Sequence, residues 1–333
     1  MKRSGLFAGV WLVVVLLFLS GCQPAEILLP TPMATAVLLG TFTPQPTPTY
    51  TLIPTVTETA VPTSTPVLQR PSPTPFPTDT PPATATTPAN AITQTIGFST
   101  QGRPIVAYQF KNGPNHVVFV GGIHGGYEWN TILLAYEAID YFRVNLDRIP
   151  DAVTLHIIPS ANPDGQFLVT GREGRFAPSH VSGDTFPGRL NGNAVDLNRN
   201  WDCQWQQWAL WRDQRVSGGS EPFSEPETIA LRDYLLALQP KGVIFWHSAL
   251  NAAIASGCPT TYQPSYDLAT VYGLASGYPI IEAFTSYAIT GDASDWLTTQ
   301  GIPAITVELI NHDDTDWPQN LAGMLAVLFY DNK

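Results

Sequence analysis

A long segment near the N-terminus, residues 23–90, has a composition that cannot form a folded core. It contains 16 prolines and 18 threonines, together half of its 68 residues, and only four charged side chains. Proline fixes φ, and repeated Thr-Pro units favour an extended, solvated chain. We therefore expect a disordered stalk over residues 22–90. The remaining residues, 91–333, are enough for one folded domain with a large hydrophobic core.

The residues before this stalk have the pattern of a bacterial lipoprotein signal. Two basic residues precede an apolar run over residues 6–19, and the small Ser20 and Gly21 come directly before Cys22. The run is shorter than the ~20 residues that a membrane-spanning helix needs, which favours cleavage before the cysteine over a permanent span. We expect a signal peptide over residues 1–21, lipid on Cys22, and attachment to the outer face of the bacterial cell membrane.

Charge excludes one class of partner. The formal net charge of −11 lies entirely in residues 91–333, which contain 24 acidic and 13 basic side chains. A protein that binds the phosphate backbone needs a basic surface, so we exclude nucleic acid as a main partner. No glycine-rich phosphate loop follows a predicted strand, which argues against a nucleotide cofactor. As a separate expectation, the protein is a monomer.

Cys203 and Cys258 are the two cysteines of the domain. Outside the cytoplasm an even pair of cysteines commonly forms a disulfide. Two buried thiols and a metal site are the alternatives, although the two positions lack the clustered spacing of a structural zinc site. We favour the disulfide.

Short β-branched and aromatic runs alternate with helical stretches along the domain. Ser224, followed three residues later by Glu227, predicts a capping box at the start of one helix. The alternation predicts a single α/β domain with a central mixed, mostly parallel twisted sheet covered by helices on both faces. Functional sites in such folds lie in the loops that follow strand ends. The expected strands are residues 117–120, 153–158, 242–246 and 304–310, and the expected helices are residues 131–144, 225–238 and 317–330.

Two histidines and a glutamate lie just past predicted strands. His124 and Glu128 follow one strand in a glycine-rich segment, and His247 follows another. Imidazole and carboxylate ligands suit Zn²⁺, and three protein ligands leave a fourth position for water. A single histidine is more often a hydrogen-bonded core or surface residue, and on these residues alone that alternative stays open.

Two further groups of polar residues suggest substrate chemistry. Arg199 offers a planar fork of donors for a carboxylate, Asn198 adds amide donors beside it, and Arg189 lies ten residues earlier. The alternative is a loop held by its own hydrogen bonds. Glu308 places a carboxylate inside an apolar strand, where burial perturbs the pKa in the manner expected of a general base. The alternative is a structural glutamate paired with an arginine.

The order of these motifs resembles the zinc metallocarboxypeptidases, the carboxypeptidase A-like family. The resemblance runs from about residue 117 to residue 309, and the compact domain is closest to short bacterial members such as murein-peptide amidases. It implies a carboxypeptidase-like fold and one zinc ion per chain. The matching segments are His124 to Glu128, Asn162-Pro163-Asp164-Gly165, Val195-Asp196-Leu197-Asn198-Arg199-Asn200, Trp246-His247-Ser248, Thr306-Val307-Glu308-Leu309 and, like the tyrosine loop of the family, residues 287–296.

The resemblance implies a role for each matching residue. The implied roles are zinc ligation by His124, Glu128 and His247; orientation of the His124 ring by Asp196; binding of the terminal carboxylate by Asn198 and Arg199; stabilisation of the oxyanion by Arg189, in preference to Arg172 or Arg175; closure over the substrate by Tyr287; and proton transfer from zinc-bound water to the leaving amine by Glu308. Together these roles imply a zinc-dependent exopeptidase that hydrolyses the C-terminal amide bond of peptides.

One departure from the family pattern concerns the first two ligands. The family places two residues between them, whereas Gly125, Gly126 and Tyr127 separate His124 from Glu128. Glycine adopts φ angles that are closed to other residues, so we expect the loop to absorb the extra residue.

Substrate preference rests on two residues of the tyrosine loop. By the resemblance, Ser294 lies deep in the side-chain pocket, and Asp292 lies two residues earlier. An Asp292 side chain that points into the pocket favours a basic or zwitterionic substrate side chain such as lysine or diaminopimelate. The alternative is that Asp292 is a solvated loop aspartate.

Three other functions stay open: a murein-peptide amidase, an N-acyl amino acid deacylase and a non-catalytic peptide-binding lipoprotein. A chelator-sensitive peptidase assay separates the last from the enzymes. No folded pro-domain is evident before residue 91, so we expect no zymogen.

Overall fold

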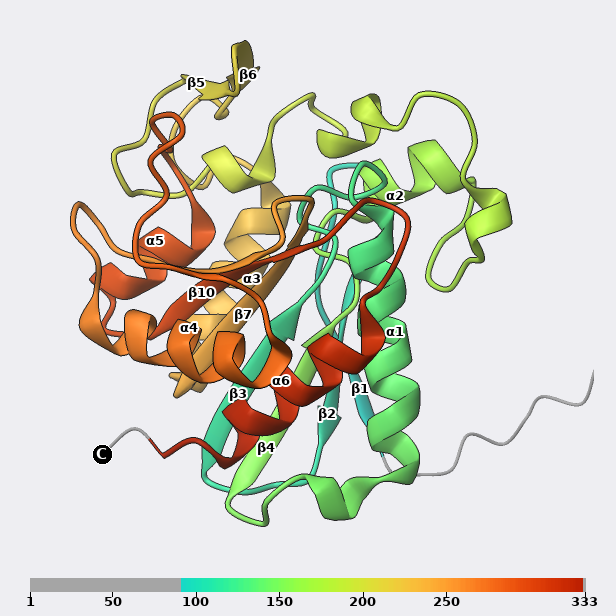
Figure 1. Ribbon diagram of the computed structural model, residues 1–333. Coiled ribbons are helices and arrows are strands. Elements are labelled where there is room, and N and C mark those ends of the chain that lie inside the picture. Colours follow the sequence, from blue (N-terminus) through green and yellow to red (C-terminus); the bar gives the residue numbers. More distant parts are fainter. Residues whose placement is uncertain (1–90, 332–333) are drawn as a thin grey trace, which may run out of the picture. The chain divides into compact units, whose positions relative to one another are not determined.

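Residues 91–331 are described by the computed structural model shown in Figure 1. The predicted signal peptide, Cys22 and the Pro/Thr-rich stalk lie outside these residues and stay predictions. Within residues 91–331, no helix is both long and apolar enough to cross a membrane.

A sheet of eight strands forms the centre of the domain, in the order β1-β2-β4-β3-β7-β10-β8-β9. The strands are β1 (Ile92–Phe98), β2 (Pro104–Phe110), β3 (Asn115–Val120), β4 (Val153–Ile158), β7 (Gly242–Ser248), β8 (Ala252–Ala255), β9 (Ile280–Ile281) and β10 (Ala304–Leu309). Pairing is parallel from β4 through β3 and β7 to β10, and between β8 and β9, and antiparallel at the other three junctions. The predicted mixed, mostly parallel sheet is confirmed.

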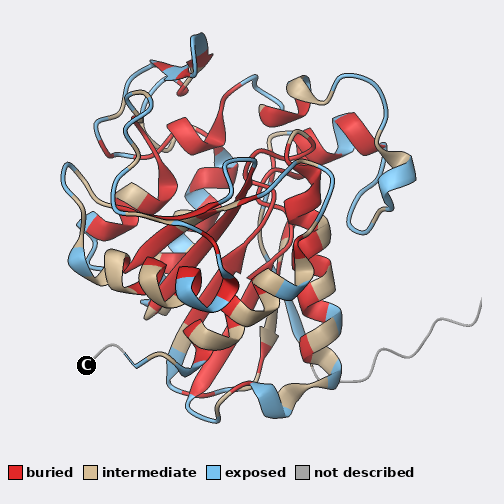
Figure 2. Ribbon diagram, in the orientation of Figure 1, coloured by how far each residue is buried: buried red, intermediate tan, exposed pale blue. Residues whose placement is uncertain are grey.

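Helices cover both faces of this sheet (Figure 1). They are α1 (Trp129–Val144), α2 (Pro163–Thr170), α3 (Pro226–Leu238), α4 (Gln263–Ser276), α5 (Ala293–Thr299) and α6 (Trp317–Phe329). Residues of α1, α4 and α6 form the core on one face, and residues of α3 and α5 form the core on the other. Figure 2 shows the central strands buried along their length. Burial on both faces explains why these strands read as continuous apolar runs.

The seven elements expected from the sequence are present, and their ends are displaced by no more than two residues. The expected strands are β3, β4, β7 and β10, and the expected helices are α1, α3 and α6. The strands that the sequence did not predict are mostly short or partly exposed. They lack the continuous apolar run on which the prediction of a strand depended.

The predicted capping box at the start of α3 is wrong. Glu225 occupies the N-cap position and forms no side-chain capping hydrogen bond. Ser224 Oγ donates to Glu225 Oε1 at 2.8 Å, and Glu227 Oε1 accepts from the Thr100 N–H at 2.8 Å. The reason is Pro226, which occupies the first helical turn and starts the helix one residue later than the capping box requires.

Loops at the carboxyl ends of β3, β7 and β10 surround the candidate site. A separate two-stranded hairpin, β5 (Trp208–Trp211) and β6 (Gln214–Ser217), stands over this end of the sheet in Figure 1. The 3₁₀ helices are Leu146–Arg148, Pro178–His180, Phe186–Arg189 and Leu197–Arg199. The predicted disulfide between Cys203 and Cys258 is confirmed, with an S–S distance of 2.00 Å, and it fastens two of the surrounding loops together.

Candidate active site

Two adjacent parallel strands bring His124 and His247 together. β3 pairs with β7 in parallel, with Val120 opposite Phe245. The loop after β3, which carries His124, therefore meets the last residues of β7, which include His247. Glu128 ends the same loop and immediately precedes α1.

The loop over residues 121–128 folds back on itself. Gly125 has a φ of +44°, and a Cβ there would lie 2.6 Å from the carbonyl oxygen of Gly188, so only glycine fits. The Tyr127 N–H donates to the His124 carbonyl at 3.0 Å, which closes a turn. This turn returns Glu128 to the side of His124 although three residues separate them. The extra residue is accommodated without moving the carboxylate away.

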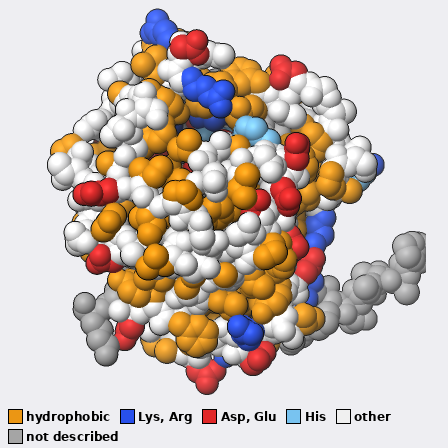
Figure 3. All heavy atoms as spheres, viewed as in Figure 1, with side chains coloured by type: hydrophobic (Ala, Val, Ile, Leu, Met, Phe, Trp, Pro, Cys, Tyr) orange, Lys and Arg blue, Asp and Glu red, His pale blue; other side chains and the backbone are white. Residues whose placement is uncertain are grey.

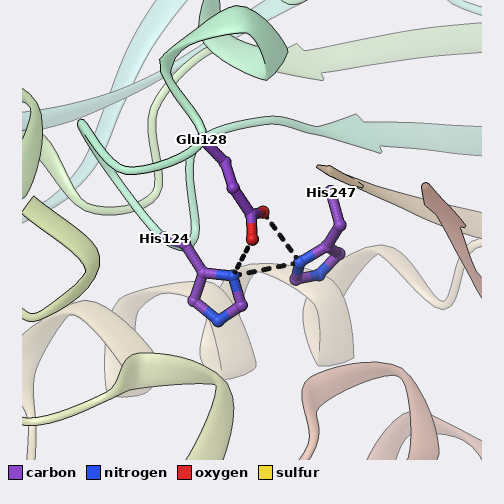
Figure 4. A group of neighbouring side chains, drawn as sticks. All are labelled: His124, Glu128 and His247. Atoms are coloured by element: carbon purple, nitrogen blue, oxygen red, sulfur yellow. Dashed lines mark hydrogen bonds and ion pairs between the residues drawn. The ribbon is translucent and has the colours of Figure 1, made fainter. Parts of the chain in front are cut away.

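The side chains of His124, Glu128 and His247 converge on one point (Figure 4). All three are buried, and one ligand atom from each lies within 4.8 Å of the others. Glu128 Oε1 is 2.8 Å from His124 Nδ1, Glu128 Oε2 is 3.1 Å from His247 Nδ1, and the two Nδ1 atoms are 3.2 Å apart. Buried acceptors this close repel one another unless a cation or proton lies among them. The donor set therefore fits a divalent metal such as zinc.

An arginine and an aspartate hold the ring of His124. Arg189 Nη1 lies 3.2 Å from His124 Nδ1, the same atom that faces Glu128 Oε1 at 2.8 Å. His124 Nε2 in turn faces Asp196 Oδ1 at 3.3 Å. Arg189 also binds Asp196 through Nε and Nη2, both at 2.9 Å from Oδ2. With its ring proton on Nε2 and directed at Asp196, His124 would have Nδ1 available to bind a metal, the arrangement that second-sphere partners commonly impose.

The charge of Asp196 is stabilised by the same contacts. Burial raises the pKa of Asp196, but Arg189 and His124 outweigh burial and hold that pKa well below its usual range. Asp196 Oδ1 also accepts the Asn198 N–H at 3.0 Å. The carboxylate is thus ionised throughout the neutral range and available as a fixed anchor.

Glu308 lies next to His247 across the β7–β10 pairing. Its side chain faces the same cavity as the three metal-binding candidates. Burial and the neighbouring Glu128 carboxylate raise the pKa of Glu308 to about 7. A carboxyl group that titrates near neutral pH can both accept and return a proton there.

A cavity of about 660 Å³ opens onto these groups. All of the predicted substrate contacts line it: Arg189, Asn198, Arg199, Tyr287, Asp292 and Ser294. Asp196 is fully buried behind this lining. Tyr287 is half-buried and packs against the β5–β6 hairpin, beside Phe284 with a ring-centroid distance of 4.9 Å. The structure therefore gathers the predicted metal-binding, catalytic and substrate-binding residues around one space.

Asn198 and Asp292 fix one side of the cavity. Asn198 Nδ2 donates to Asp292 Oδ2 at 2.7 Å. Asp292 is also the N-cap of α5, where Oδ1 accepts the N–H groups of Ser294 and Asp295. Arg199 is anchored through Nη1 to the Asn198 carbonyl at 2.7 Å. These polar residues hold the loop by their own hydrogen bonds and also face the cavity. A structural role in the loop and a role in binding substrate are therefore compatible.

The sequence interpretation missed two parts of the lining. Asp295 lies one residue after Ser294, inside the quoted tyrosine-loop segment, and faces the cavity. Burial and the Asp292 carboxylate raise the pKa of Asp295 to about 7. The second missed part is the β5–β6 hairpin, which contributes Trp211 and Arg212. A Trp-Arg pair in a short amphipathic hairpin carries no motif, so only proximity in the fold reveals it.

Comparison with protein families and curated proteins gives a consistent answer. The family model described as Peptidase M14, zinc carboxypeptidase, matches residues 83–320. A gamma-D-glutamyl-L-diamino acid endopeptidase 1 from Lysinibacillus sphaericus is 27% identical over 268 residues, covering 70% of this chain and 66% of that protein. Murein peptide amidase A of Escherichia coli strain K12 is 31% identical over 163 residues, covering 46% of this chain and 57% of that protein. The chain thus spans less than two thirds of either relative.

A solved structure supports the architecture. The carboxypeptidase A from Helicoverpa armigera superposes with a TM-score of 0.59 over 72% of this chain and 68% of that one, at 20% sequence identity. At this identity the likeness concerns the fold, in which the loops after β3, β7 and β10 meet as described above.

Proposed function

The chain belongs to the zinc carboxypeptidase family, and from this premise we propose that it is a zinc-dependent exopeptidase acting on peptides with a free C-terminal carboxylate. The observation that carries the proposal is the convergence of His124, Glu128 and His247 on one buried point. Glu308 faces the same cavity. These are the groups needed to hold a metal and to move a proton beside it.

The metal would be held by His124, Glu128 and His247. When bound, zinc supplies a Lewis acid and lowers the pKa of a water molecule toward ~7. Asp196 Oδ1, 3.3 Å from His124 Nε2, would take the ring proton of a metal-bound His124, which leaves Nδ1 as the ligand atom.

Glu308 would accept the proton of the attacking water and return it to the leaving amine. Its pKa of about 7 matches both tasks at neutral pH. Arg189 lines the cavity beside His124, where its guanidinium would stabilise the developing oxyanion. Loss of one such donor typically costs ~3 kcal/mol of transition-state stabilisation.

Arg199 and Asn198 would bind the terminal carboxylate. Bound there, the carboxylate would leave the last amide bond as the one that reaches the metal-binding group in the same cavity. Tyr287, which is half-buried at the hairpin side, would close over the bound residue. This arrangement explains why cleavage would occur at the chain end.

The side-chain pocket would favour a residue with an amino group. Asp292 and Asp295 both face the cavity, with Ser294 between them. Asp292 is held by Asn198 and by α5, whereas Asp295 Oδ1 accepts one N–H, from Gly257 at 2.9 Å. The raised pKa of Asp295 reflects burial and the repulsion of the two carboxylates, which a cationic side chain would relieve. Lysine and diaminopimelate meet this requirement.

A second candidate is hydrolysis of murein peptides that contain diaminopimelate. The observation that favours it is again the pair of pocket carboxylates. Two of the relatives carry names for such activities, a gamma-D-glutamyl-L-diamino acid endopeptidase and a murein peptide amidase. Both candidate functions use the same metal, base and carboxylate-binding groups, and they differ in the peptide that precedes the last residue.

The test is metal content together with release of C-terminal residues from matched peptides ending in Phe, Lys or diaminopimelate. We expect one zinc per chain, chelator-sensitive release, and preference for Lys or diaminopimelate over Phe. Glu308→Gln should retain zinc and lose nearly all turnover. Gln101→Ala, a surface change outside the cavity lining, is the control. A metal-free wild type, or substantial turnover by Glu308→Gln, would contradict the proposal.

We also propose that the enzyme works outside the cytoplasm. Lipid on Cys22 would attach it to the outer face of the membrane, and the Pro/Thr-rich stalk would separate the domain, as a monomer, from the lipid surface. Labelling with palmitate should mark the wild type and leave Cys22→Ala unlabelled. Equal labelling of both would remove the anchor from the proposal.

A further inference from the structure

Strand β5 ends beside both arginines that the proposed reaction uses. The Leu210 carbonyl oxygen accepts a hydrogen bond from Arg199 Nε at 3.2 Å. The next residue, Trp211, is buried, and its ring centroid lies 4.7 Å from the guanidinium carbon of Arg189. Figure 3 shows basic side chains next to a hollow at the end of the molecule where Figure 1 draws the hairpin. The β5–β6 hairpin is therefore placed to control how these two arginines are oriented.

Asp196 binds the Arg189 guanidinium through a single oxygen atom. Arg189 Nε and Nη2 both lie 2.9 Å from Asp196 Oδ2. In a pair with two parallel hydrogen bonds, two oxygen atoms fix the plane of the guanidinium, whereas donors that converge on one oxygen atom let that plane tilt about it. Tilting would move Nη1, the atom that lies 3.2 Å from His124 Nδ1 and 3.7 Å from Glu128 Oε1. A further contact is needed to fix the plane.

The ring of Trp211 supplies this further contact. A guanidinium is planar and stacks on aromatic faces, and indole is the best of the aromatic partners for a cation. The ring itself is held by Phe186, which stacks on it with centroids 5.4 Å apart, and by Tyr127, which meets it edge-on at 5.5 Å. Phe186 begins the 3₁₀ helix that ends at Arg189. Trp211 thus contacts both ends of the short helix that carries the arginine.

We infer that Trp211 is a positioning residue, which holds the Arg189 guanidinium in the orientation that stabilises the oxyanion. The inference rests on the proposed function, because that function gives Arg189 this task. The contact with the terminal carboxylate does not depend on the ring, since Arg199 is held by the carbonyl groups of Leu210 and Asn198. Loss of the ring should therefore weaken stabilisation of the transition state and leave binding of the peptide in its ground state almost unchanged.

Two other residues of the hairpin provide matched controls. Trp208 is exposed on the other face of β5 and lies outside the cavity lining, with the guanidinium of Arg215 5.4 Å from its ring centroid. Trp208→Leu therefore removes an indole ring and its contact with an arginine away from the site. Val216 is buried in the hairpin cluster that contains Trp211. Val216→Ala loosens that cluster while the ring over Arg189 stays, so the two controls separate this contact from the stability of the hairpin.

Kinetics and binding, measured on the full chain, separate the two kinds of effect. For a peptide ending in Lys, Trp211→Leu should lower kcat about tenfold and Trp211→Phe about threefold, in the range for a buried cation that loses an aromatic partner. In the Glu308→Gln background, Trp211→Leu should change the Kd of the same peptide, measured by calorimetry, by less than about twofold. Trp208→Leu and Val216→Ala should keep kcat within about twofold of the wild type. If Trp211→Leu does not fold, the threefold loss in Trp211→Phe is the result that decides.

The orientation of Arg189 is also measured without turnover. In the full chain with isotope-labelled arginine, NMR should show slow exchange of the Arg189 Nε–H with water, because this group is buried and donates to Asp196. Its signal is identified by its loss in Arg189→Lys. With zinc and with a chelator alike, Trp211→Leu should make this exchange about tenfold faster, whereas Trp208→Leu should leave it unchanged.

Three results would overturn the inference: an unchanged kcat in Trp211→Leu, a Kd that rises by the factor by which kcat falls, or an Arg189 Nε–H that exchanges at the wild-type rate. A wild type without chelator-sensitive hydrolysis would refute the proposed function instead. Faster exchange in Trp211→Leu would then still establish that the ring orients Arg189, and an unchanged rate would refute that contact as well.

Discussion

Two pairs of neighbouring histidines lie at opposite ends of β3, one pair past its carboxyl end and one near its start, and they have opposite chemistry. His124 and His247 have ring centroids 4.7 Å apart at the carboxyl end of the strands. His116 on β3 and His156 on β4 have ring centroids 5.1 Å apart, away from the cavity. Distance between the rings therefore does not distinguish a metal site from a structural pair.

The partners of the rings make the difference. Burial lowers the pKa of His247, but the Glu128 carboxylate outweighs burial and raises that pKa above its usual value. Burial and the neighbouring His116 lower the pKa of His156 to about 4. Its other hydrogen-bond partner, the hydroxyl of Tyr234 at 2.8 Å, brings no negative charge to oppose this. A carboxylate makes a buried histidine pair attract positive charge, whereas neutral partners make it exclude positive charge.

The largest expected effect comes from removing the carboxylate. Glu128→Gln takes away the negative charge that distinguishes the first pair and also one of three metal-binding candidates. We expect zinc affinity to fall by more than about 100-fold, which is the upper range for losing an outer-sphere partner, and activity to fall with it. Zinc content after dialysis and peptide hydrolysis measure the two effects.

The control for this change is His156→Gln, which alters the other pair and should leave zinc content unchanged. A Glu128→Gln protein that keeps a full complement of zinc would show that this carboxylate is not a ligand. The difference between the two pairs would then need another cause.

The second prediction concerns pH and the structural pair. The pKa of His156 is about 4 in the folded protein and 6.5 in the unfolded chain. Between these values the unfolded chain binds a proton that the folded protein does not, so the free energy of unfolding falls as pH falls. The contribution is fully present above pH 6.5, and about 3 kcal/mol is lost by pH 4.

Urea unfolding at pH 7 and pH 5, with a chelator present, measures the first part of this loss, about 2 kcal/mol. His156→Gln should be less sensitive to the same change in pH than the wild type, since glutamine does not titrate. The comparison between the two proteins cancels the carboxylates that both contain. Identical pH dependence would show that the His156 ring is not kept neutral by the fold.

The sequence predicted the first pair and not the second, for a physical reason. His124 and His247 follow strand ends, where parallel strands place functional loops, and Glu128 and Asp196 occur in a recognisable order around them. His156 lies inside a strand that was read as apolar, and its partner Tyr234 is 78 residues away on α3. Nothing in the local pattern indicates that these side chains meet.

The same limit applies to the fold and to the rest of the site. Continuous apolar runs predicted the central strands, whereas the exposed strand β1 and the hairpin β5–β6 have no such run. The capping box failed because Pro226 moved the helix start by one residue. The hairpin was missed as part of the lining because its place depends on packing of Trp211 against Arg189 and Tyr127, which are far apart in the chain.

The smallest expected effect comes from removing the neutral partner of the second pair. Tyr234→Phe deletes the hydroxyl that bonds His156 Nδ1, and burial raises the pKa of Tyr234 to about 12, so this hydroxyl is neutral throughout the physiological range. A buried hydrogen bond of this kind contributes about 1 kcal/mol to the free energy of unfolding. Zinc content and activity should not change, because Tyr234 is absent from the cavity lining.

A double-mutant cycle with His156→Gln isolates the contact: the loss in free energy of unfolding caused by Tyr234→Phe should be smaller when His156 is already replaced. An equal cost in both backgrounds would mean that the hydroxyl stabilises the fold through other neighbours.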